Sequence, residues 1–309
     1  MNPAAKKWLR RGGIFLLGLA VVLSAVVGAG LYLAERRMNR KLDIAVRAVP
    51  LRELTDTAAI ARGQYLYASR GCVDCHGAGG GGRSFIDDPN GMRVAGPHIG
   101  AGVGSVTARY QAADWVRAIR HGVDPSGRPL LIMPSEDYNR FTDEDLGALV
   151  AYIRSMPPTE GGAAVMKLPV PVRALYGFGM IQDAAAKIDH GVPPPQPVAN
   201  AVTREHGAYV ANMCLGCHGP ALAGGRIPGG PPDWPPASRL APGDGSVMAR
   251  YPDAESLTRM FRSGRRPDGS AVRVMPFESL GAISDTDIQA LHLYLRSLAT
   301  GIKPVPARG

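Results

Sequence analysis

The sequence predicts an all-α protein in which an N-terminal transmembrane helix precedes two similar helical domains. Three observations carry this prediction: a long uncharged apolar run near the N-terminus, an internal repeat, and helical spacing of apolar residues in each copy of the repeat. The chain has 309 residues, a length at which two domains are common. Its 39 glycines and 27 prolines favour short helices joined by irregular loops over extended sheets.

The first predicted element is a membrane anchor within residues 1–41, followed by a linker at 42–57. No charged residue occurs among the 21 residues from Ile14 to Ala34. A helix of that length, rising about 1.5 Å per residue, spans the roughly 30 Å hydrocarbon core of a bilayer. A cleaved signal peptide is the alternative, because small residues at 28–30 suit a peptidase. The apolar run exceeds the roughly 7 to 15 residues usual in such peptides, which favours a retained anchor.

The net charge of +9 is concentrated in this N-terminal segment. Residues 1–41 carry eight Lys or Arg and one acidic residue, Glu35, so the remaining chain has 27 basic and 25 acidic residues. The body is nearly neutral and has no basic stripe interleaved with aromatic side chains, which argues against nucleic-acid binding. Basic residues lie on both sides of the apolar run, so charge leaves the orientation of the anchor open.

The two halves of the chain align at an offset of 142 residues. The repeat predicts domains at 58–158 and 202–301, an irregular, partly polyproline connector at 159–201, and a tail at 302–309. The paired positions include Cys72/Cys214, Cys75/Cys217, His76/His218, Gly122/Gly264, Met133/Met275, Pro134/Pro276, Asp145/Asp287 and Tyr152/Tyr294.

Each copy is expected to contain a short helix leading into the cysteines, a central helix near residue 112 or 254, and a terminal helix. An N-cap followed three residues later by an acidic residue marks the start of each terminal helix: Thr142 with Asp145, and Ser284 with Asp287. Apolar residues at helical spacing then give each terminal helix one inward face: Leu146, Leu149, Val150 and Ile153, and Ile288, Leu291, Leu295 and Leu298.

All four cysteines lie in two CxxCH motifs, Cys72 to His76 and Cys214 to His218, and none is left for a disulfide. Two cysteines separated by two residues can bond both vinyl groups of one haem, and the adjacent histidine is placed to ligate the iron. A zinc ribbon also pairs CxxC motifs, but with about 15 to 20 residues between them, and a thioredoxin-like site needs a βαβ context. The motifs therefore predict two covalently bound haem c groups.

Each motif histidine is followed at the same interval by a Met-Pro pair, which begins at Met133 in the first half and at Met275 in the second. Methionine thioether is a common second axial ligand and raises the potential of a haem. The sequence therefore predicts that His76 and Met133 ligate one iron, and that His218 and Met275 ligate the other. Methionines without a methionine counterpart are interpreted as core residues: Met92, Met156, Met248 and Met260.

With these motifs the sequence resembles the class I cytochrome c family, in particular the membrane-bound multihaem cytochrome subunits of periplasmic gluconate and alcohol dehydrogenases. The resemblance covers about 58–158 and 202–300 and implies two tandem class I cytochrome c domains. Those subunits usually bind three haems, whereas this chain has two motifs and an N-terminal anchor. The matching stretches are RGQYLYASRGCVDCHG, REHGAYVANMCLGCHG, LIMPSEDYNRFTDEDLGALVAYIRSMPP and RVMPFESLGAISDTDIQALHLYLRSL.

The resemblance also implies roles for residues around each haem. In the family a proline often accepts a hydrogen bond from the proximal histidine, which suggests Pro97 in the first domain and Pro236 in the second. Family members cross their first and last helices at a small residue against an aromatic one, here Gly63 with Tyr152 and Gly207 with Tyr294. The remaining histidines are interpreted as surface or loop residues, with His98 expected near the first haem: His98, His121, His190, His206 and His292.

Four arginines on the predicted central helices have two open interpretations, as ligands of haem propionates or as a solvated helix face: Arg117, Arg120, Arg259 and Arg262. Haem c is attached outside the cytoplasm in bacteria, so the resemblance implies an inner-membrane protein with its haem domains in the periplasm.

Protein ligands on both sides of each iron leave no substrate position, so we expect outer-sphere electron transfer rather than catalysis. The expected role is that of a respiratory carrier between a membrane dehydrogenase or quinol-oxidising partner and a soluble cytochrome or terminal oxidase. The alternatives are a dihaem enzyme, either a peroxidase or an inorganic sulfur-compound dehydrogenase, and a structural scaffold for a respiratory complex.

Overall fold

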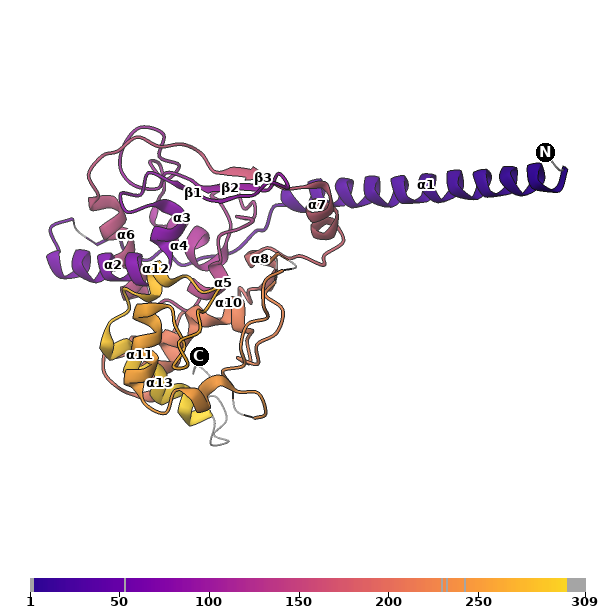
Figure 1. Ribbon diagram of the computed structural model, residues 1–309. Coiled ribbons are helices and arrows are strands. Elements are labelled where there is room, and N and C mark those ends of the chain that lie inside the picture. Colours follow the sequence, from indigo (N-terminus) through magenta and orange to yellow (C-terminus); the bar gives the residue numbers. More distant parts are fainter. Residues whose placement is uncertain (1–2, 53, 229, 232, 242, 299–309) are drawn as a thin grey trace.

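The computed structural model of the chain describes residues 3–52, 54–228, 230–231, 233–241 and 243–298. A long N-terminal helix, α1 (Pro3–Met38), extends from a mostly helical body, which confirms the expected predominance of helix (Figure 1). The tail expected at 302–309, and the end of the second domain expected at 301, lie outside the described residues.

Helix α1 stands away from the body along most of its length (Figure 1). Between Lys6 and Met38 it is long and apolar enough to cross a membrane. Large apolar side chains along it, such as Phe15 and Leu17, are exposed, so it is not a core helix of the body. The helix fits the membrane anchor expected from the sequence.

The first group of helices surrounds the first cysteine motif. Asp56 and Thr142 cap the first and last helices of the group by accepting the backbone N–H three residues on, as expected for Thr142. The predicted inward face of the last helix is buried in one hydrophobic cluster with Leu66 and Trp115. The helices are α2 (Thr57–Ser69), α3 (Cys72–His76), α4 (Ala112–His121), α5 (Ser135–Tyr138) and α6 (Asp143–Ser155).

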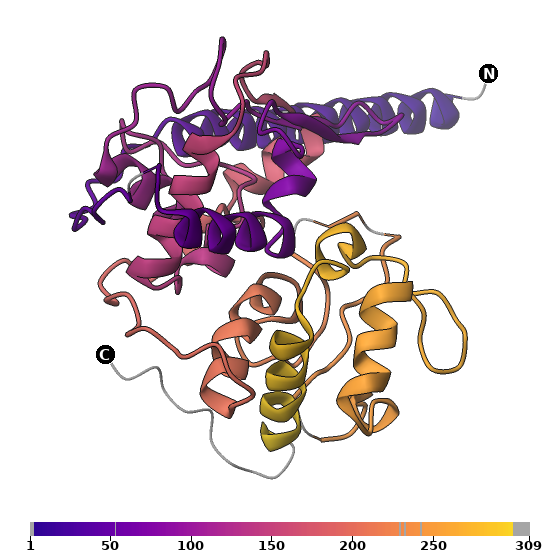
Figure 2. The same cartoon turned by 90° about the vertical axis from the view of Figure 1, so that its left-hand side faces the viewer.

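A second group repeats this arrangement around the second motif (Figure 2, orange to yellow). Ser284 accepts the N–H of Asp287, as expected, and the predicted face of α13 is buried in a separate cluster with Val210 and Phe261. The helices are α9 (Arg204–Ala211), η1 (Asn212–Cys214), α10 (Leu215–His218), η2 (Val247–Arg250), α11 (Ala254–Ser263), α12 (Phe277–Leu280) and α13 (Asp285–Leu298).

In each group the first and last helices cross at a glycine, as the family resemblance implies. A Cβ atom on Gly63 would lie 2.0 Å from the carbonyl oxygen of Ala148 and 2.7 Å from Cβ of Tyr152. A Cβ atom on Gly207 would lie 2.0 Å from the corresponding oxygen of Ala290. Only glycine permits these backbones to approach so closely.

The segment expected to be an irregular connector is more ordered than predicted. Strand β3 (Val165–Lys167) pairs with β2 (Arg93–Gly96), which pairs in turn with β1 (Arg83–Asp87) in one antiparallel sheet. Helix α7 (Val170–Gly177) packs against α1, and α8 (Ala184–Lys187) lies against α5. These short elements have no periodic apolar pattern long enough to mark them in the sequence.

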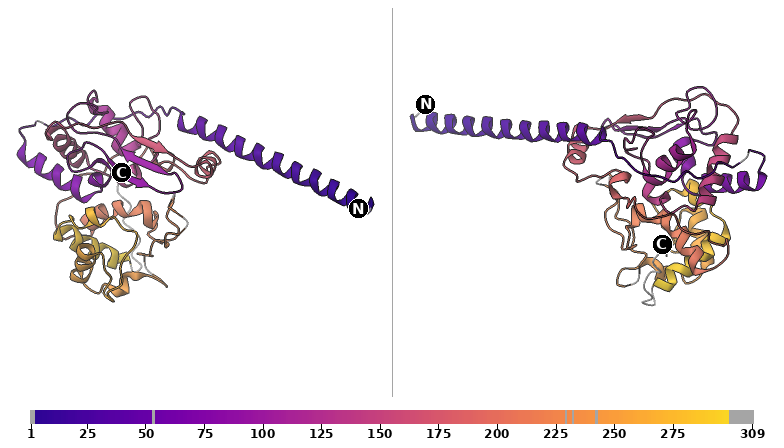
Figure 3. Two further views of the ribbon diagram at one scale, coloured as in Figure 1. Left: turned by 45° about the horizontal axis from the view of Figure 1, so that its top comes forward. Right: turned by 180° about the vertical axis from the view of Figure 1, so that it is seen from behind.

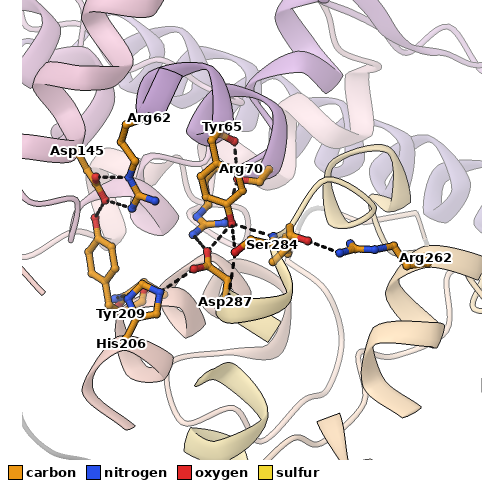
Figure 4. Close-up of polar contacts among 12 residues, drawn as sticks. Arg62, Tyr65, Arg70, Asp145, His206, Tyr209, Arg262, Ser284 and Asp287 are labelled. Carbon is orange, nitrogen blue, oxygen red and sulfur yellow. Dashed lines mark hydrogen bonds and ion pairs between the residues drawn. The ribbon is translucent and has the colours of Figure 1, made fainter. Parts of the chain in front are cut away.

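The two groups of helices contact each other through equivalent residues that exchange roles (Figure 4). Tyr65 of α2 donates to Asp287 of α13 at 2.6 Å, and Tyr209 of α9 donates to Asp145 of α6 at 2.7 Å. Each tyrosine oxygen also accepts a hydrogen bond from the backbone N–H of the residue that caps the partner's terminal helix: Ser284 for Tyr65, at 3.1 Å, and Thr142 for Tyr209, at 3.3 Å. Each tyrosine lies two residues after the crossing glycine of its own helix. The contact is therefore close to two-fold symmetric.

A buried ion pair lies at the centre of this contact. Arg70 donates to Asp287 at 2.5 Å, and both side chains are buried. His206 adds a hydrogen bond to the other oxygen of the same carboxylate at 2.7 Å. Burial alone would raise the pKa of Asp287, but these partners hold it well below its usual range. The carboxylate therefore stabilises the native state in its charged form.

Replacing Asp287 by asparagine is expected to lower the free energy of unfolding by about 3–5 kcal/mol, because Arg70 would stay buried without its counter-charge. The native pKa of Asp287 is below its value in the unfolded chain, about 3.9. The charged carboxylate therefore contributes fully to the free energy of unfolding above that pH, and the contribution is lost as the pH falls below it. Urea unfolding across this pH range measures both effects. Glu205→Gln, on an exposed side chain of α9, is the matched control; equal losses in the two variants would contradict the assignment.

Candidate cofactor sites

A single helical turn presents the first motif to a cavity. Helix α3 follows Gly71, whose φ is 84°, and ends at Gly77, whose φ is 72°. The turn places Cys72, Cys75 and His76 on the cavity wall. Positive φ angles favour glycine, so glycine at positions 71 and 77 allows the chain to turn sharply on each side of the motif.

The cavity brings together the residues that the sequence predicted for the first haem. Met133 lies on its wall with the three motif residues, and Trp115, Ile119, Leu149 and other apolar side chains form most of the remainder. Cofactor pockets usually have apolar walls and a few polar groups, so the lining of this cavity fits a porphyrin.

The ring of His76 is fixed in the orientation that a metal ligand needs. Its Nδ1–H donates to the carbonyl oxygen of Pro97 at 2.9 Å, which is the contact implied for Pro97. Because a carbonyl oxygen can only accept, Nδ1 carries the proton and Nε2 keeps its lone pair. Burial lowers the pKa of His76, although the Pro97 hydrogen bond opposes this, so the neutral ring is favoured.

The second motif faces a similar, mostly apolar cavity, with Cys214, His218 and Met275 on its wall. The Nδ1–H of His218 donates to the carbonyl oxygen of Ser238 at 2.7 Å, so the expectation for Pro236 is wrong. An antiparallel bridge between Gly225 and Ala237 brings the following carbonyl, that of Ser238, to the imidazole. Cys217 is exposed.

The second cavity contains more thioethers than the sequence alignment predicted. Met213, Met248 and Met260 lie on its wall beside Met275. Met248 and Met260 are buried, as expected for core residues. In the first cavity, Met166 of β3 joins Met133 on the wall. Position on a cavity wall therefore does not single out one methionine as the predicted iron ligand, whereas the repeat does, because only Met133 and Met275 of these methionines occupy equivalent positions.

Arg120 is buried, so it does not belong to a solvated helix face, whereas Arg262 is exposed as that interpretation expects. Each donates to the first acidic residue of the terminal helix and to a backbone carbonyl in the loop before that helix, and neither lies on a cavity wall. Arg117 and Arg259 pair with acidic residues of their own helices. Sequence reasoning missed other arginines on the wall of the second cavity, where cations can meet propionates: Arg250 and Arg266.

The interpretation of the unpaired histidines as surface or loop residues is wrong for His121 of α4 and His206 of α9, which are buried in helices; His98 lies in a loop, as expected, but is buried there. His98 lies 3.2 Å from the carbonyl oxygens of Ala101 and Val103, and His121 lies 3.0 Å from Nδ1 of His190. These histidines satisfy buried polar groups of the fold, a role that leaves no mark in motif spacing.

The middle residues of both motifs reach across the contact between the two groups of helices. The carboxylate of Asp74 in α3 accepts from the hydroxyl of Ser279 in α12. The N–H of Gly216 in α10 donates to Asp137 of α5 at 2.7 Å. Asp74 and Gly216 are equivalent in the repeat, as are Asp137 and Ser279. The contact therefore turns the two motifs toward each other.

The cysteine thiols lack the features of a thiolate redox or zinc site. Burial raises the pKa of Cys72 to about 12, of Cys75 to about 11 and of Cys214 to about 12. Activated redox cysteines have lowered pKa values instead. Within the described ranges, no group of three or more His, Cys, Asp and Glu side chains is arranged to hold a metal ion. This argues against both alternatives for the CxxC pairs.

Residues 58–153 match the family described as cytochrome c oxidase, cbb3-type, subunit III. This part of the chain is a cytochrome c domain. The match includes the first motif, Met133 and most of α6, and a cytochrome c domain implies covalently bound haem c. The expected resemblance is thereby confirmed.

The chain is similar to cytochrome subunits of membrane dehydrogenases. It is 29% identical over 282 residues to the fructose dehydrogenase cytochrome subunit of Gluconobacter japonicus, covering 82% of this chain and 56% of that protein. It is 27% identical over 278 residues to the gluconate 2-dehydrogenase cytochrome c subunit of Pantoea cypripedii, covering 78% and 60%. The cytochrome c subunit of a quinone-dependent alcohol dehydrogenase from Gluconacetobacter polyoxogenes is 27% identical over 286 residues, covering 81% and 57%. The chain thus spans at most about three-fifths of these relatives.

Proposed function

We propose that the chain is a membrane-anchored dihaem cytochrome c that carries electrons from a dehydrogenase or quinol-oxidising partner to a downstream cytochrome or terminal oxidase. One observation carries the proposal: in each half, at least one motif cysteine, the motif histidine and the Met-Pro methionine lie on the wall of the same apolar cavity. The proposed binding residues are Cys72, Cys75, His76, Pro97 and Met133, and Cys214, Cys217, His218 and Met275.

The second half supports a second cytochrome c domain. It repeats the glycine crossing of the first half, the N-cap of the last helix and the hydrogen bond from the motif histidine to a backbone carbonyl. We therefore assign tandem domains at 58–158 and 202–301, each with its own hydrophobic cluster.

Bound haem c supplies an iron that takes up and releases one electron. His76 and His218 would each present Nε2 to it, and Met133 and Met275 would each present a thioether. A histidine and a methionine on each iron would leave no coordination position for a substrate, which supports a carrier rather than a peroxidase or a sulfur-compound dehydrogenase.

The contact between the domains supports transfer within the chain. Asp74 and Gly216, in the middle of the two motifs, are each hydrogen-bonded to the opposite domain. The buried pair of Arg70 and Asp287 fixes the same contact. A rigid contact between motifs keeps the distance between the two sites constant, which suits electron exchange.

The anchor is proposed to be retained. Gly30 packs against α7, and Arg40 forms a bidentate ion pair with Asp183, with N–O distances of 2.7 and 2.8 Å. Cleavage near residues 28–30 would remove part of this packed contact. Because haem c is attached outside the cytoplasm, we place the domains in the periplasm and the anchor in a bacterial inner membrane.

The names of the relatives suggest the donor. They are cytochrome subunits of fructose, gluconate and quinone-dependent alcohol dehydrogenases. We therefore propose that the catalytic subunit of a membrane dehydrogenase reduces this chain, and that a soluble cytochrome or an oxidase reoxidises it.

Affinity purification of the full chain from detergent-solubilised native membranes is expected to recover a dehydrogenase flavoprotein or quinoprotein. Adding the substrate of that subunit should then reduce the haems, as followed by absorbance. A high-spin, five-coordinate resting iron with turnover of peroxide or thiosulfate would instead support an enzyme. Complex assembly and activity that survive removal of both CxxCH motifs would support a scaffold.

A further inference from the structure

A cluster of exposed apolar side chains lies on and just after α7. Val170 is 49% exposed, Leu175 37%, Phe178 45% and Met180 74%. Water-soluble proteins rarely expose several large apolar residues together, and such a patch usually marks an interaction surface. We call these four residues the α7 patch.

The α7 patch lies where the anchor meets the body (Figures 1 and 3). A Cβ atom on Gly177 would lie 2.0 Å from the carbonyl oxygen of Gly30, and a Cβ atom on Gly30 would lie 2.8 Å from the ring of Phe178. Gly30 is four residues before the end of the uncharged run at Ala34, a rise of about 6 Å along the helix. The patch is therefore level with the edge of the hydrocarbon layer that α1 would cross.

Polar groups fix the opposite side of this segment. Arg37 donates to the carbonyl oxygen of Tyr176 at 3.0 Å, and the hydroxyl of Tyr176 donates to Asp183 at 2.6 Å. Arg173 pairs with Glu35 of the anchor at 3.6 Å. The segment is thus amphipathic, with a charged side bound to the anchor and body and an apolar side that is exposed.

We infer that α7, with Phe178 and Met180, lies in the membrane interface beside the anchor and inserts its patch among the lipid acyl chains. The patch continues the exposed apolar surface of α1, where Val27 is 40% exposed and Leu33 38%. Amphipathic helices bury their apolar side about 5–10 Å deep at this boundary. The inference rests on the retained anchor proposed above. A second attachment beside α1 would restrict the tilt of the first cytochrome c domain on the membrane.

Spin-label accessibility in lipid nanodiscs tests this inference directly. Full-length protein with haem attached is placed one copy per disc in phosphatidylethanolamine and phosphatidylglycerol. A nitroxide is bound to Met180→Cys, to Leu23→Cys within the anchor, or to Leu293→Cys on α13. Leu23 and Leu293 are 56% and 40% exposed. The parent protein must take up no label, because its cysteines are bonded to haem.

At Met180→Cys, the ratio of collision with oxygen to collision with a water-soluble nickel complex is expected to be several-fold higher than at Leu293→Cys. A label at Leu175→Cys should give the same result. If Met180→Cys matches Leu293→Cys while Leu23→Cys reports hydrocarbon, the patch lies in water and the inference is wrong, although the anchor stands. If Leu23→Cys also reports water, the retained anchor and the inference both fail.

Discussion

Replacing Met275 by alanine is expected to lower the midpoint potential of one haem by on the order of 0.1 V, within the span of about 0.8 V that axial ligands set. Loss of the thioether removes the ligand that favours the reduced iron. Water or another side chain would take its place. A potentiometric titration of the purified protein, followed by absorbance, should show one wave displaced and the other unchanged. Met133→Ala should displace the other wave.

Neighbouring methionines provide the matched controls. Met260 lies on the same cavity wall as Met275, and Met166 on the same wall as Met133. Met260→Ala and Met166→Ala should move the potentials much less, because they remove packing and keep the ligand. If Met260→Ala displaces the wave and Met275→Ala does not, the register of the repeat has selected the wrong ligand.

Replacing Gly63 by alanine is expected to lower the free energy of unfolding by about 3 kcal/mol or more, at the upper end of overpacking effects. The added methyl would meet the backbone oxygen of Ala148 at 2.0 Å, and a backbone cannot turn aside as a flexible side chain can. Helices α2 and α6 would have to separate. Thermal or urea unfolding of the haem-loaded protein measures the loss.

Gly162→Ala is the control for this prediction. Apart from Gly162 itself and its two chain neighbours, nothing lies within 4 Å of the Cβ position of Gly162, and its φ is not positive, so alanine should change stability by less than about 0.5 kcal/mol. Gly207→Ala should reproduce the loss in the second domain. Similar stabilities for Gly63→Ala and Gly162→Ala would show that the helix crossing tolerates separation.

The helices and their caps were predictable because local chemistry determines them. Thr142 and Ser284 cap α6 and α13 as their spacing predicts, and the apolar faces that follow are buried. Likewise, the interval from motif histidine to Met-Pro identified residues that share a cavity wall, since a repeated fold keeps repeated distances.

The contact between the domains was missed for a specific reason. Between the crossing glycine and the first cysteine, the first half has two more residues than the second, so the offset there is 144 and not 142. His206 then corresponds to Arg62, and both bind the acidic residue of their own terminal helix. A comparison of the two halves at the single offset of 142 could not show that His206 and Arg62 are equivalent.

The remaining misses depend on tertiary contacts. Strand β3 is three residues long and forms because β2 lies beside it, and α7 exposes apolar side chains where the anchor ends. The carbonyl of Ser238, rather than Pro236, reaches His218 because of a bridge between two distant loop residues. None of these is encoded in a pattern of neighbouring residues.

The intact mass of the mature, denatured protein tests the central claim most directly. Covalent attachment at both motifs predicts the mass of the polypeptide plus two haems, which denaturation does not remove. Cys214→Ser with Cys217→Ser should reduce this to one haem. A mature chain that carries one haem or none would contradict the dihaem assignment.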